Sequence, residues 1–198
     1  MRITGGSARG IRLQAPSGKQ TRPATDQMRE AVFSSLGDLL VDAEVADWFA
    51  GTGAYGLEAL SRGARYCTFF ESDPSALSCL KGNLQAVSHC LQQPPQSLAA
   101  VMRKDLLTTQ STLERVTQVQ VVFVDPPYEK LQTHWQPLLD KLRQSVLAPD
   151  GIAVFEVPGD WDQPTEGWQL LKRLGKSHRG KPNALLLSPL ATHPQTHV

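Results

Sequence analysis

The stretch FAGTGAYG, Phe49–Gly56, decides the fold class of this 198-residue chain. It follows an apolar run at 45–49 and precedes a segment of helical character at 55–62, so it connects a strand to a helix. Its glycines have the GxGxxG spacing, which permits a tight turn and close approach of a ligand to the backbone: Gly51, Gly53 and Gly56. Glu71 ends the next apolar run, 20 residues after Gly51, where a carboxylate can accept hydrogen bonds from both ribose hydroxyls of an adenosine. Together these features predict a nucleoside-binding site rather than a plain tight turn and a solvated acid.

Around this stretch, short apolar runs alternate with helical segments. The runs predict strands at 45–49, 67–71, 99–103, 121–125, 152–157, 168–174 and 184–188. Helices fit at 55–62, 74–88 and 132–147, and an amphipathic helix follows Thr25 as its N-cap. Because the strands are continuously apolar, they suit a parallel sheet covered on both faces. We therefore expect an α/β fold with a doubly wound, mostly parallel, seven-stranded Rossmann-like sheet, whose last two strands form an antiparallel edge.

The chain is expected to form one compact domain with short extensions. Residues 1–24 are rich in glycine, arginine and proline and show little periodicity, so we expect a basic N-terminal arm or irregular hairpin outside the core. Residues 25–190 would form the Rossmann-like domain, and residues 191–198 a disordered tail. No apolar run reaches the ~20 residues of a membrane helix and the start lacks a secretory signal, which favours a cytoplasmic protein. The three cysteines lack CxxC spacing, so we expect reduced thiols and no metal site.

The net charge of +1 conceals two basic ends. Residues 1–30 carry six lysines and arginines against two acids, and residues 172–198 carry five against none. This distribution favours a polyanionic partner held by both ends of the chain, although short basic stretches can also simply be solvated.

The fourth apolar run ends in an unusual way, in VVFVDPPYEK at 121–130. Asp125 supplies a carboxylate acceptor at the strand end. Pro126 and Pro127 have no N–H and hold the backbone rigid, so the Pro126 carbonyl can point outward without a competing donor. Tyr128 adds a flat ring beside these two acceptors. Such a site is a receptor for an aromatic amine, because acceptors that hold both amine hydrogens direct the nitrogen lone pair at an electrophile.

Two enzyme classes share the glycine loop. A nicotinamide dehydrogenase usually carries this fingerprint in its first strand–helix unit, with the helix N-terminus facing a pyrophosphate. Here 44 residues precede the first predicted strand, and the fourth strand ends in DPPY. The predicted amine receptor therefore favours a group-transfer enzyme that acts on a nucleobase.

The motifs resemble those of amino-methyltransferases that use S-adenosylmethionine, and in particular those of the RsmD family, bacterial guanine-N2 methyltransferases of 16S rRNA. The resemblance runs in order from residue 1 to about 157, through MRITGGSARGIRL, RPATDQMREAVFSSL, DWFAGTGAYGLEALSRGA and DPPY. The C-terminal segment SHRGKPNALLL departs from the "RYG"-like turn of the family. The resemblance implies a Rossmann-like methyltransferase sheet with S-adenosyl-L-methionine as the cofactor. It also implies 16S rRNA, within an assembled or assembling small ribosomal subunit, as the partner. Nothing in the sequence calls for more than one copy of the chain, so we expect a monomer.

The resemblance further implies roles for individual residues. Those that bind the cofactor would be Arg22, Thr25, Phe49, Gly51, Gly53, Glu71, Asp105 and Leu106. Of these, Glu71 would bind the ribose, Asp105 and the Leu106 N–H would bind the adenine, and Arg22 and Thr25 would close over the methionine end. Thr25 and Asp105 could equally serve as helix caps. Catalysis would depend on Asp125, Pro126, Pro127 and Tyr128, and RNA phosphates would be bound by Arg2, Arg9, Arg12 and Lys19.

Two other functions compete with this interpretation. A DNA adenine-N6 methyltransferase shares DPPY but usually carries a separate target-recognition domain, which is missing here and counts against this function. A non-catalytic RNA-binding module would use the basic ends but would have no use for Glu71 or Asp125.

Overall fold

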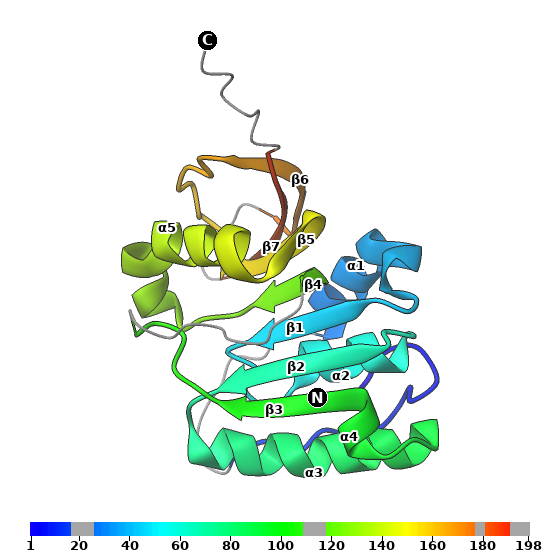
Figure 1. Ribbon diagram of the computed structural model, residues 1–198. Helices are drawn as coiled ribbons and strands as arrows, with labels where there is room; N and C mark the ends of the chain where they lie inside the picture. Colours follow the sequence, from blue (N-terminus) through cyan, green and yellow to red (C-terminus); the bar gives the residue numbers. More distant parts are fainter. Residues whose placement is uncertain (17–25, 109–117, 177–180, 191–198) are drawn as a thin grey trace.

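The computed structural model describes residues 1–16, 26–108, 118–176 and 181–190 (Figure 1). Its strands are β1 Glu44–Trp48, β2 Tyr66–Glu71, β3 Ala99–Arg103, β4 Val119–Val124, β5 Leu147–Pro158, β6 Trp168–Leu174 and β7 Pro182–Pro189. Its helices are α1 Asp26–Leu36, the 3-10 helix η1 Gly37–Leu40, α2 Ala54–Ser61, α3 Pro74–Leu91, α4 Pro95–Leu98 and α5 Tyr128–Ser145. Within these described ranges, no helix is both long and apolar enough to cross a membrane.

The strands form a seven-stranded sheet in the order β3-β2-β1-β4-β5-β7-β6. β1 to β5 run parallel, while β7 pairs antiparallel with β5 and with β6. The prediction of a mostly parallel seven-stranded sheet with an antiparallel edge is confirmed. The strand order reverses at β1 and β4, and in sheets of this kind ligands bind outside the carboxyl ends of the strands at that point.

Helices cover both faces of the sheet (Figure 1). On one face, α1, α2 and α3 pack through side chains that include Phe33, Leu57 and Leu80. On the other face lies α5, whose Trp135 meets Phe155 of β5 edge to face, with ring centroids 4.7 Å apart. Because both faces are buried, the central strands are apolar throughout rather than alternating, which is why the sequence revealed them so clearly.

The boundaries of the elements around DPPY differ from the prediction. β4 ends at Val124, one residue before Asp125. α5 begins at Tyr128 rather than at residue 132, with Pro127 as its N-cap. A proline is tolerated there because the first N–H groups of a helix have no partner within the helix. The helix therefore starts directly from the DPPY turn, and its first residue is the aromatic one.

Residues 1–13 form an irregular hairpin, closed by a bridge between Arg2 and Arg12. The expectation that this segment lies outside the core is wrong, since three of its apolar side chains join the cluster under α1, α2 and α3: Ile3, Ala8 and Leu13. The buried carboxylate of Glu58 in α2 holds the hairpin by accepting hydrogen bonds from Thr4 N at 2.8 Å and Thr4 Oγ1 at 2.7 Å. The apolar residues of this hairpin follow neither helical nor strand periodicity, so the pattern did not reveal their burial.

Candidate active site

The glycine loop leaves the end of β1 in a strained conformation. Phe49, Gly51 and Gly53 have positive φ angles of 62°, 54° and 83°, and such an angle is uncommon for a phenylalanine. A Cβ at Gly51 would meet only the Phe49 carbonyl oxygen, 4.0 Å away, whereas a Cβ at Gly53 would collide with Leu80 of α3. Gly51 therefore leaves open space over the loop for a ligand, and Gly53 allows α2 and α3 to pack.

Two carboxylates hold this loop in place. Asp47 of β1 accepts a hydrogen bond from Gly56 N at 2.8 Å, across the turn. Glu71, at the end of β2, accepts from Gly51 N at 2.8 Å through Oε2 and from Ser72 N at 2.7 Å through Oε1. A carboxylate has about four acceptor positions, so Glu71 can hold the loop and still accept a hydrogen bond from a ligand hydroxyl.

The DPPY turn lies directly beside the glycine loop. β1 and β4 are neighbours with Trp48 opposite Val124, and the next residue, Asp125, donates its N–H to the Trp48 carbonyl oxygen at 3.3 Å. Pro126 is buried, Pro127 is exposed, and Tyr128 is half-buried at the start of α5. The structure therefore brings together the two motifs that the sequence placed about 70 residues apart.

Sequence reasoning missed two residues of the site. Glu156 lies in β5 with only 3 % of its surface exposed, and its Oε1 accepts a hydrogen bond from the Tyr128 hydroxyl at 3.3 Å. Its Oε2 accepts from the hydroxyl of Tyr55, in the first turn of α2, at 3.1 Å. A signal was available, because Glu156 interrupts the apolar run IAVFEV, and a carboxylate inside a buried strand needs compensating partners.

Two buried carboxyl groups, Asp47 and Glu156, and the half-buried Asp125 meet at this edge of the sheet, and their pKa values are raised. Burial raises the pKa of Asp47 to about 7 and that of Glu156 to about 6, although hydrogen bonds from two tyrosines lower the latter. Burial raises the pKa of Asp125 well above its usual range, and the negative charges of Glu156 and Asp47 raise it further. These carboxyl groups therefore hold protons at pH values where ordinary carboxyl groups are ionised.

The segment after β3 was predicted to bind an adenine. Asp105 is exposed, and its Oδ1 accepts a hydrogen bond from Leu107 N at 3.0 Å, while Leu106 is buried. Lys141 of α5 donates from Nζ to the Leu106 carbonyl oxygen at 3.0 Å and so ties this segment to α5. Partial burial and the nearby Lys104 lower the pKa of Lys141.

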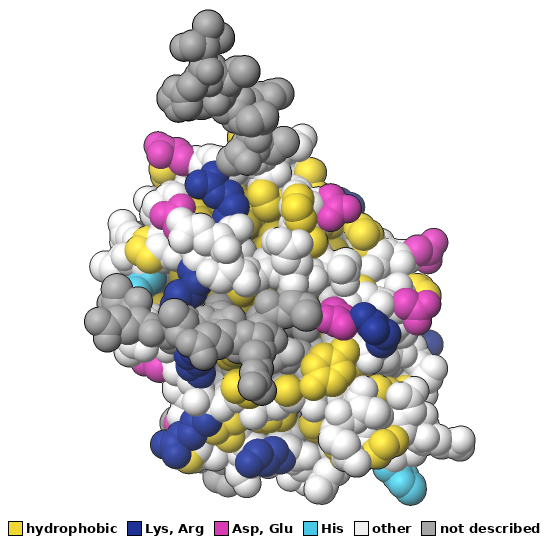
Figure 2. All heavy atoms as spheres, viewed as in Figure 1, with side chains coloured by type: hydrophobic (Ala, Val, Ile, Leu, Met, Phe, Trp, Pro, Cys, Tyr) yellow, Lys and Arg dark blue, Asp and Glu magenta, His cyan; other side chains and the backbone are white. Residues whose placement is uncertain are grey.

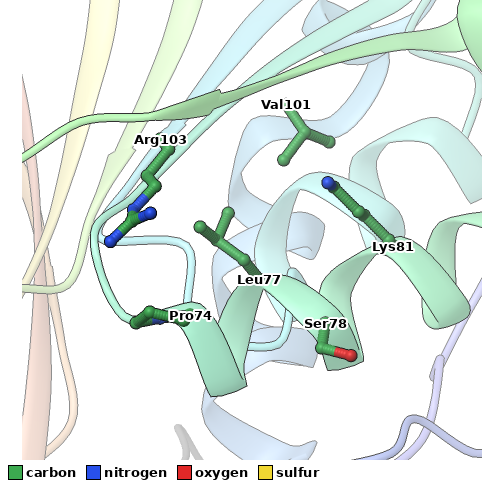
Figure 3. Close-up of a pocket in the computed structure, with 6 residues that line it drawn as sticks. All are labelled: Pro74, Leu77, Ser78, Lys81, Val101 and Arg103. Atoms are coloured by element: carbon green, nitrogen blue, oxygen red, sulfur yellow. The ribbon is translucent and has the colours of Figure 1, made fainter.

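A pocket of about 340 Å³ lies between α3 and the edge strand β3 (Figure 3). Its lining residues are Pro74, Leu77, Ser78, Lys81, Val101 and Arg103. Figure 3 shows Leu77 between the two basic side chains, so the pocket combines an apolar floor with positive charge. It adjoins the loop that carries Glu71, because Pro74 begins α3 three residues later.

The predicted RNA-binding arginines do not all lie near this site. Ser7, at the turn of the N-terminal hairpin, donates to the carbonyl oxygen of Ser61, the last residue of α2, at 2.7 Å. Because α2 runs from the carboxyl edge of the sheet to its amino edge, this turn and the nearby Arg9 lie at the far edge. Lys19, Arg22 and Thr25 are outside the described residues.

Other basic side chains lie closer to the DPPY turn. Figure 2 shows lysines and arginines along the side toward which β1 to β4 point in Figure 1. Lys130, in the first turn of α5, and Arg103, at the end of β3, are both exposed. Among the described residues, no group of three histidine, cysteine, aspartate or glutamate side chains could hold a metal ion.

A family model and several known proteins match most of this chain. The family model described as "Conserved hypothetical protein 95" matches residues 1–181. The Bacillus subtilis protein YlbH is 35% identical over 159 residues, covering 79% of this chain and 82% of that protein. Ribosomal RNA small subunit methyltransferase D of Haemophilus influenzae is 32% identical over 173 residues, covering 87% of this chain and 86% of that protein.

The solved structure of the Escherichia coli protein yhhF superposes with a TM-score of 0.78 at 30% identity, covering 97% of this chain and 99% of that one. The match therefore includes the sheet, the glycine loop and the DPPY turn described above. With this fold and these relatives, the chain belongs to the RsmD family of methyltransferases.

Proposed function

We propose that this protein transfers a methyl group from S-adenosyl-L-methionine to the exocyclic N2 amine of a guanine in 16S rRNA of the small ribosomal subunit. The observation that carries the proposal is the adjacency of the glycine loop and the DPPY turn, joined by the Asp125 N–H and the Trp48 carbonyl oxygen at 3.3 Å. A site built from these two motifs presents a nucleoside cofactor to an aromatic amine.

The residues present fit S-adenosyl-L-methionine. The open side of Gly51 accommodates a ligand against the backbone, and the carboxyl groups at this edge complement a positively charged sulfonium in their ionised form, which a bound cation would in turn favour. Phe49, Gly51 and Gly53 would hold the amino-acid part, and Glu71 the ribose. Asp105 and Leu106 would hold the adenine, with Arg22 and Thr25 closing over the methionine end. When bound, the cofactor supplies an electrophilic methyl group.

The DPPY turn would hold the target amine. One side-chain oxygen of Asp125 and the Pro126 carbonyl oxygen would accept its two hydrogens, so that the nitrogen lone pair would face the methyl group. Extruding the guanine from its stack costs a few kcal/mol, and stacking on Tyr128 returns about 1–3 kcal/mol. The rate gain comes chiefly from positioning, with no covalent enzyme intermediate. Pro127 keeps the turn rigid and caps α5.

The RNA partner would be held through its phosphates. Arg2, Arg9, Arg12 and Lys19 supply positive charge from the N-terminal segment, and the exposed Arg103 and Lys130 supply it near the DPPY turn. Such contacts give affinity and register rather than sequence choice. The substrate would be an assembled or assembling small subunit, and the enzyme would act as a monomer.

The experiment is methyl transfer from radiolabelled S-adenosyl-L-methionine to small-subunit particles that lack rRNA methylation, followed by nucleoside analysis. Label should appear in N2-methylguanosine, and Asp125→Ala should reduce it at least ~100-fold because the amine loses its acceptor. Asp150→Ala is the matched control, since Asp150 is an exposed aspartate in β5, far from the carboxyl edge.

Label in N6-methyladenosine would keep the DPPY chemistry but replace the proposal with adenine methylation. Absence of label on RNA and DNA would leave only a cofactor-binding fold. An equal loss in Asp150→Ala would show that the effect of Asp125→Ala is not specific to the site.

A further inference from the structure

One buried carboxylate connects the two halves of the site. Glu156 of β5 accepts the Tyr55 hydroxyl at 3.1 Å through one oxygen and the Tyr128 hydroxyl at 3.3 Å through the other. Tyr55 lies in the first turn of the helix that follows the glycine loop, and Tyr128 is the last residue of DPPY. Any change at Glu156 therefore reaches the cofactor side and the amine side together.

Burying the carboxylate of Glu156 costs hydration free energy that a purely structural residue would not need to lose. Glu156 has 3 % exposure, and its neighbours in the strand, Phe155 and Val157, are fully buried. A carboxylate in such surroundings loses its hydration, and two hydroxyl donors offset only part of that loss. An apolar side chain of similar volume would pack here without this cost. The charge therefore has a use beyond stabilising the fold.

Glu156 also lies beside Asp125. β4 and β5 are parallel neighbours with Val124 opposite Phe155, so the next step of the register places Asp125 opposite Glu156. The other charged or titratable groups that act on Glu156 are Tyr55 from α2, Tyr128 from α5 and Arg29 from α1, while Asp47 of β1 acts on Asp125. The negative charge of Glu156 raises the pKa of Asp125 and favours retention of a proton there.

We propose that Glu156 is a positioning residue of the methyl-transfer site: it fixes Tyr128 relative to the glycine loop and sets the protonation of Asp125 through its charge. This inference rests on the proposed function for its consequence in catalysis. The effect of the Glu156 charge on the protonation of Asp125 can be tested in the free protein, without cofactor or RNA. The reaction releases one proton from the amine nitrogen, and Asp125 can take it only in its ionised form, so the charge state of Asp125 bears on this step.

The test is Glu156→Gln, which keeps the shape of the side chain and removes the charge. Titration of the Asp125 carboxyl group, followed by carbon NMR in the free protein, should move to a lower pH in the variant because a neighbouring negative charge is gone. Glu58→Gln is the matched control: Glu58 is also a fully buried glutamate, but it bonds the N-terminal hairpin and not the site. Its Asp125 titration should match that of the unmodified protein.

Kinetics give the second readout. Glu156→Gln should lower the plateau rate of single-turnover methylation about 10- to 100-fold through lost positioning. The acid limb of its pH–rate profile should shift to lower pH, since Asp125 ionises more readily. Cofactor affinity, measured by calorimetry, should change less than threefold. Such a small change would also show that the variant is folded. Tyr55→Phe should lower the rate and shift the acid limb in the same direction but by less, because loss of the hydroxyl raises the pKa of Glu156 and so reduces its negative charge.

An Asp125 titration that is the same in Glu156→Gln and in the unmodified protein would overturn the inference, whatever the activity. An unchanged rate and acid limb in a folded Glu156→Gln protein would overturn its catalytic part. Inactivity of the unmodified protein on every RNA would instead refute the proposed function. The NMR titration would still decide whether Glu156 controls the charge of Asp125.

Discussion

The N–H of Asp125 donates a hydrogen bond to the carbonyl oxygen of Trp48, 3.3 Å away, and this contact joins the strand before DPPY to the strand before the glycine loop. The two residues continue the register in which Trp48 lies opposite Val124. Because both strands are parallel and end at the same edge, the DPPY turn and the glycine loop are fixed by the sheet and not by flexible connections. The site therefore depends on a rigid scaffold.

Replacing Glu71 should weaken cofactor binding. Its carboxylate already accepts three backbone N–H groups, from Gly51, Ser72 and Asp73, which leaves one of its about four acceptor positions for ribose. Glu71→Ala removes that charge-assisted hydrogen bond, worth about 1.5–3 kcal/mol, so Kd should rise about 10- to 100-fold. It also leaves Gly51 N without the acceptor it has at 2.8 Å. Calorimetric titration with S-adenosyl-L-methionine measures the effect, with the exposed Glu166→Ala as control. A Kd within threefold of the unmodified value would remove Glu71 from the cofactor site.

The two glycines of the loop should respond differently to alanine. Gly51→Ala should cost about 1–2 kcal/mol of unfolding free energy from the positive φ alone, yet it should block the cofactor because its Cβ occupies the open side of the loop. Gly53→Ala should cost about 2–5 kcal/mol, since the same strain is joined by overpacking against Leu80. Urea unfolding and cofactor titration separate the two effects. Equal loss of stability in both variants would contradict this assignment.

Asp47 should make the protein less stable as the pH rises. Its pKa is about 7 in the folded chain and 3.8 in an unfolded one, so the folded state holds the proton more tightly. Unfolding then releases a proton between these values, and the unfolding free energy falls with pH by at most about 1.4 kcal/mol per pH unit. Asp47→Asn lacks this dependence and retains an acceptor for Gly56 N.

The measurement is urea unfolding between pH 4.5 and pH 7.5 at constant ionic strength. The stability of the unmodified protein relative to Asp47→Asn should decline up to pH 7 and then level off. Asp150→Asn, which changes an exposed aspartate, should follow the unmodified protein at every pH. Parallel curves for Asp47→Asn and the unmodified protein would show that Asp47 ionises normally.

RNA affinity should depend on salt in a way that locates the phosphate contacts. With about five phosphates neutralised on an unpaired strand, log K should fall with log salt at a slope near −3.5. Arg12→Ala and Arg103→Ala should each reduce the magnitude of that slope by ~0.7 if both surfaces contact the RNA. Filter binding to a short 16S rRNA fragment at several salt concentrations measures the slope for each protein. A slope that responds to Arg103 alone would exclude the N-terminal hairpin as an RNA-binding surface.

Much of the fold could be predicted from the sequence because its signals are local. Apolar runs located six of the seven strands to within two residues, and β6 lies at the predicted 168–174, whereas β5 begins at Leu147, five residues before the predicted start. The glycine spacing and DPPY identified the two turns that meet at the carboxyl edge of β1 and β4. The start of α5 was predicted four residues late, because a helix that begins at a proline turn shows no apolar period in its first turn.

The sequence by itself determined the α/β class, the glycine loop, Glu71 and the DPPY turn, since each depends on residues that are close together in the chain. Only the tertiary structure showed that Ile3 is part of the core and that Glu156 meets Tyr55 and Tyr128, which are 101 and 28 residues away. These contacts follow from the strand order, which places β5 beside β4, and from the packing of α2 on the face of the sheet from which Glu156 meets Tyr55. Neither hydrophobic periodicity nor motif spacing carries that information, because long-range packing decides which distant side chains share a buried site.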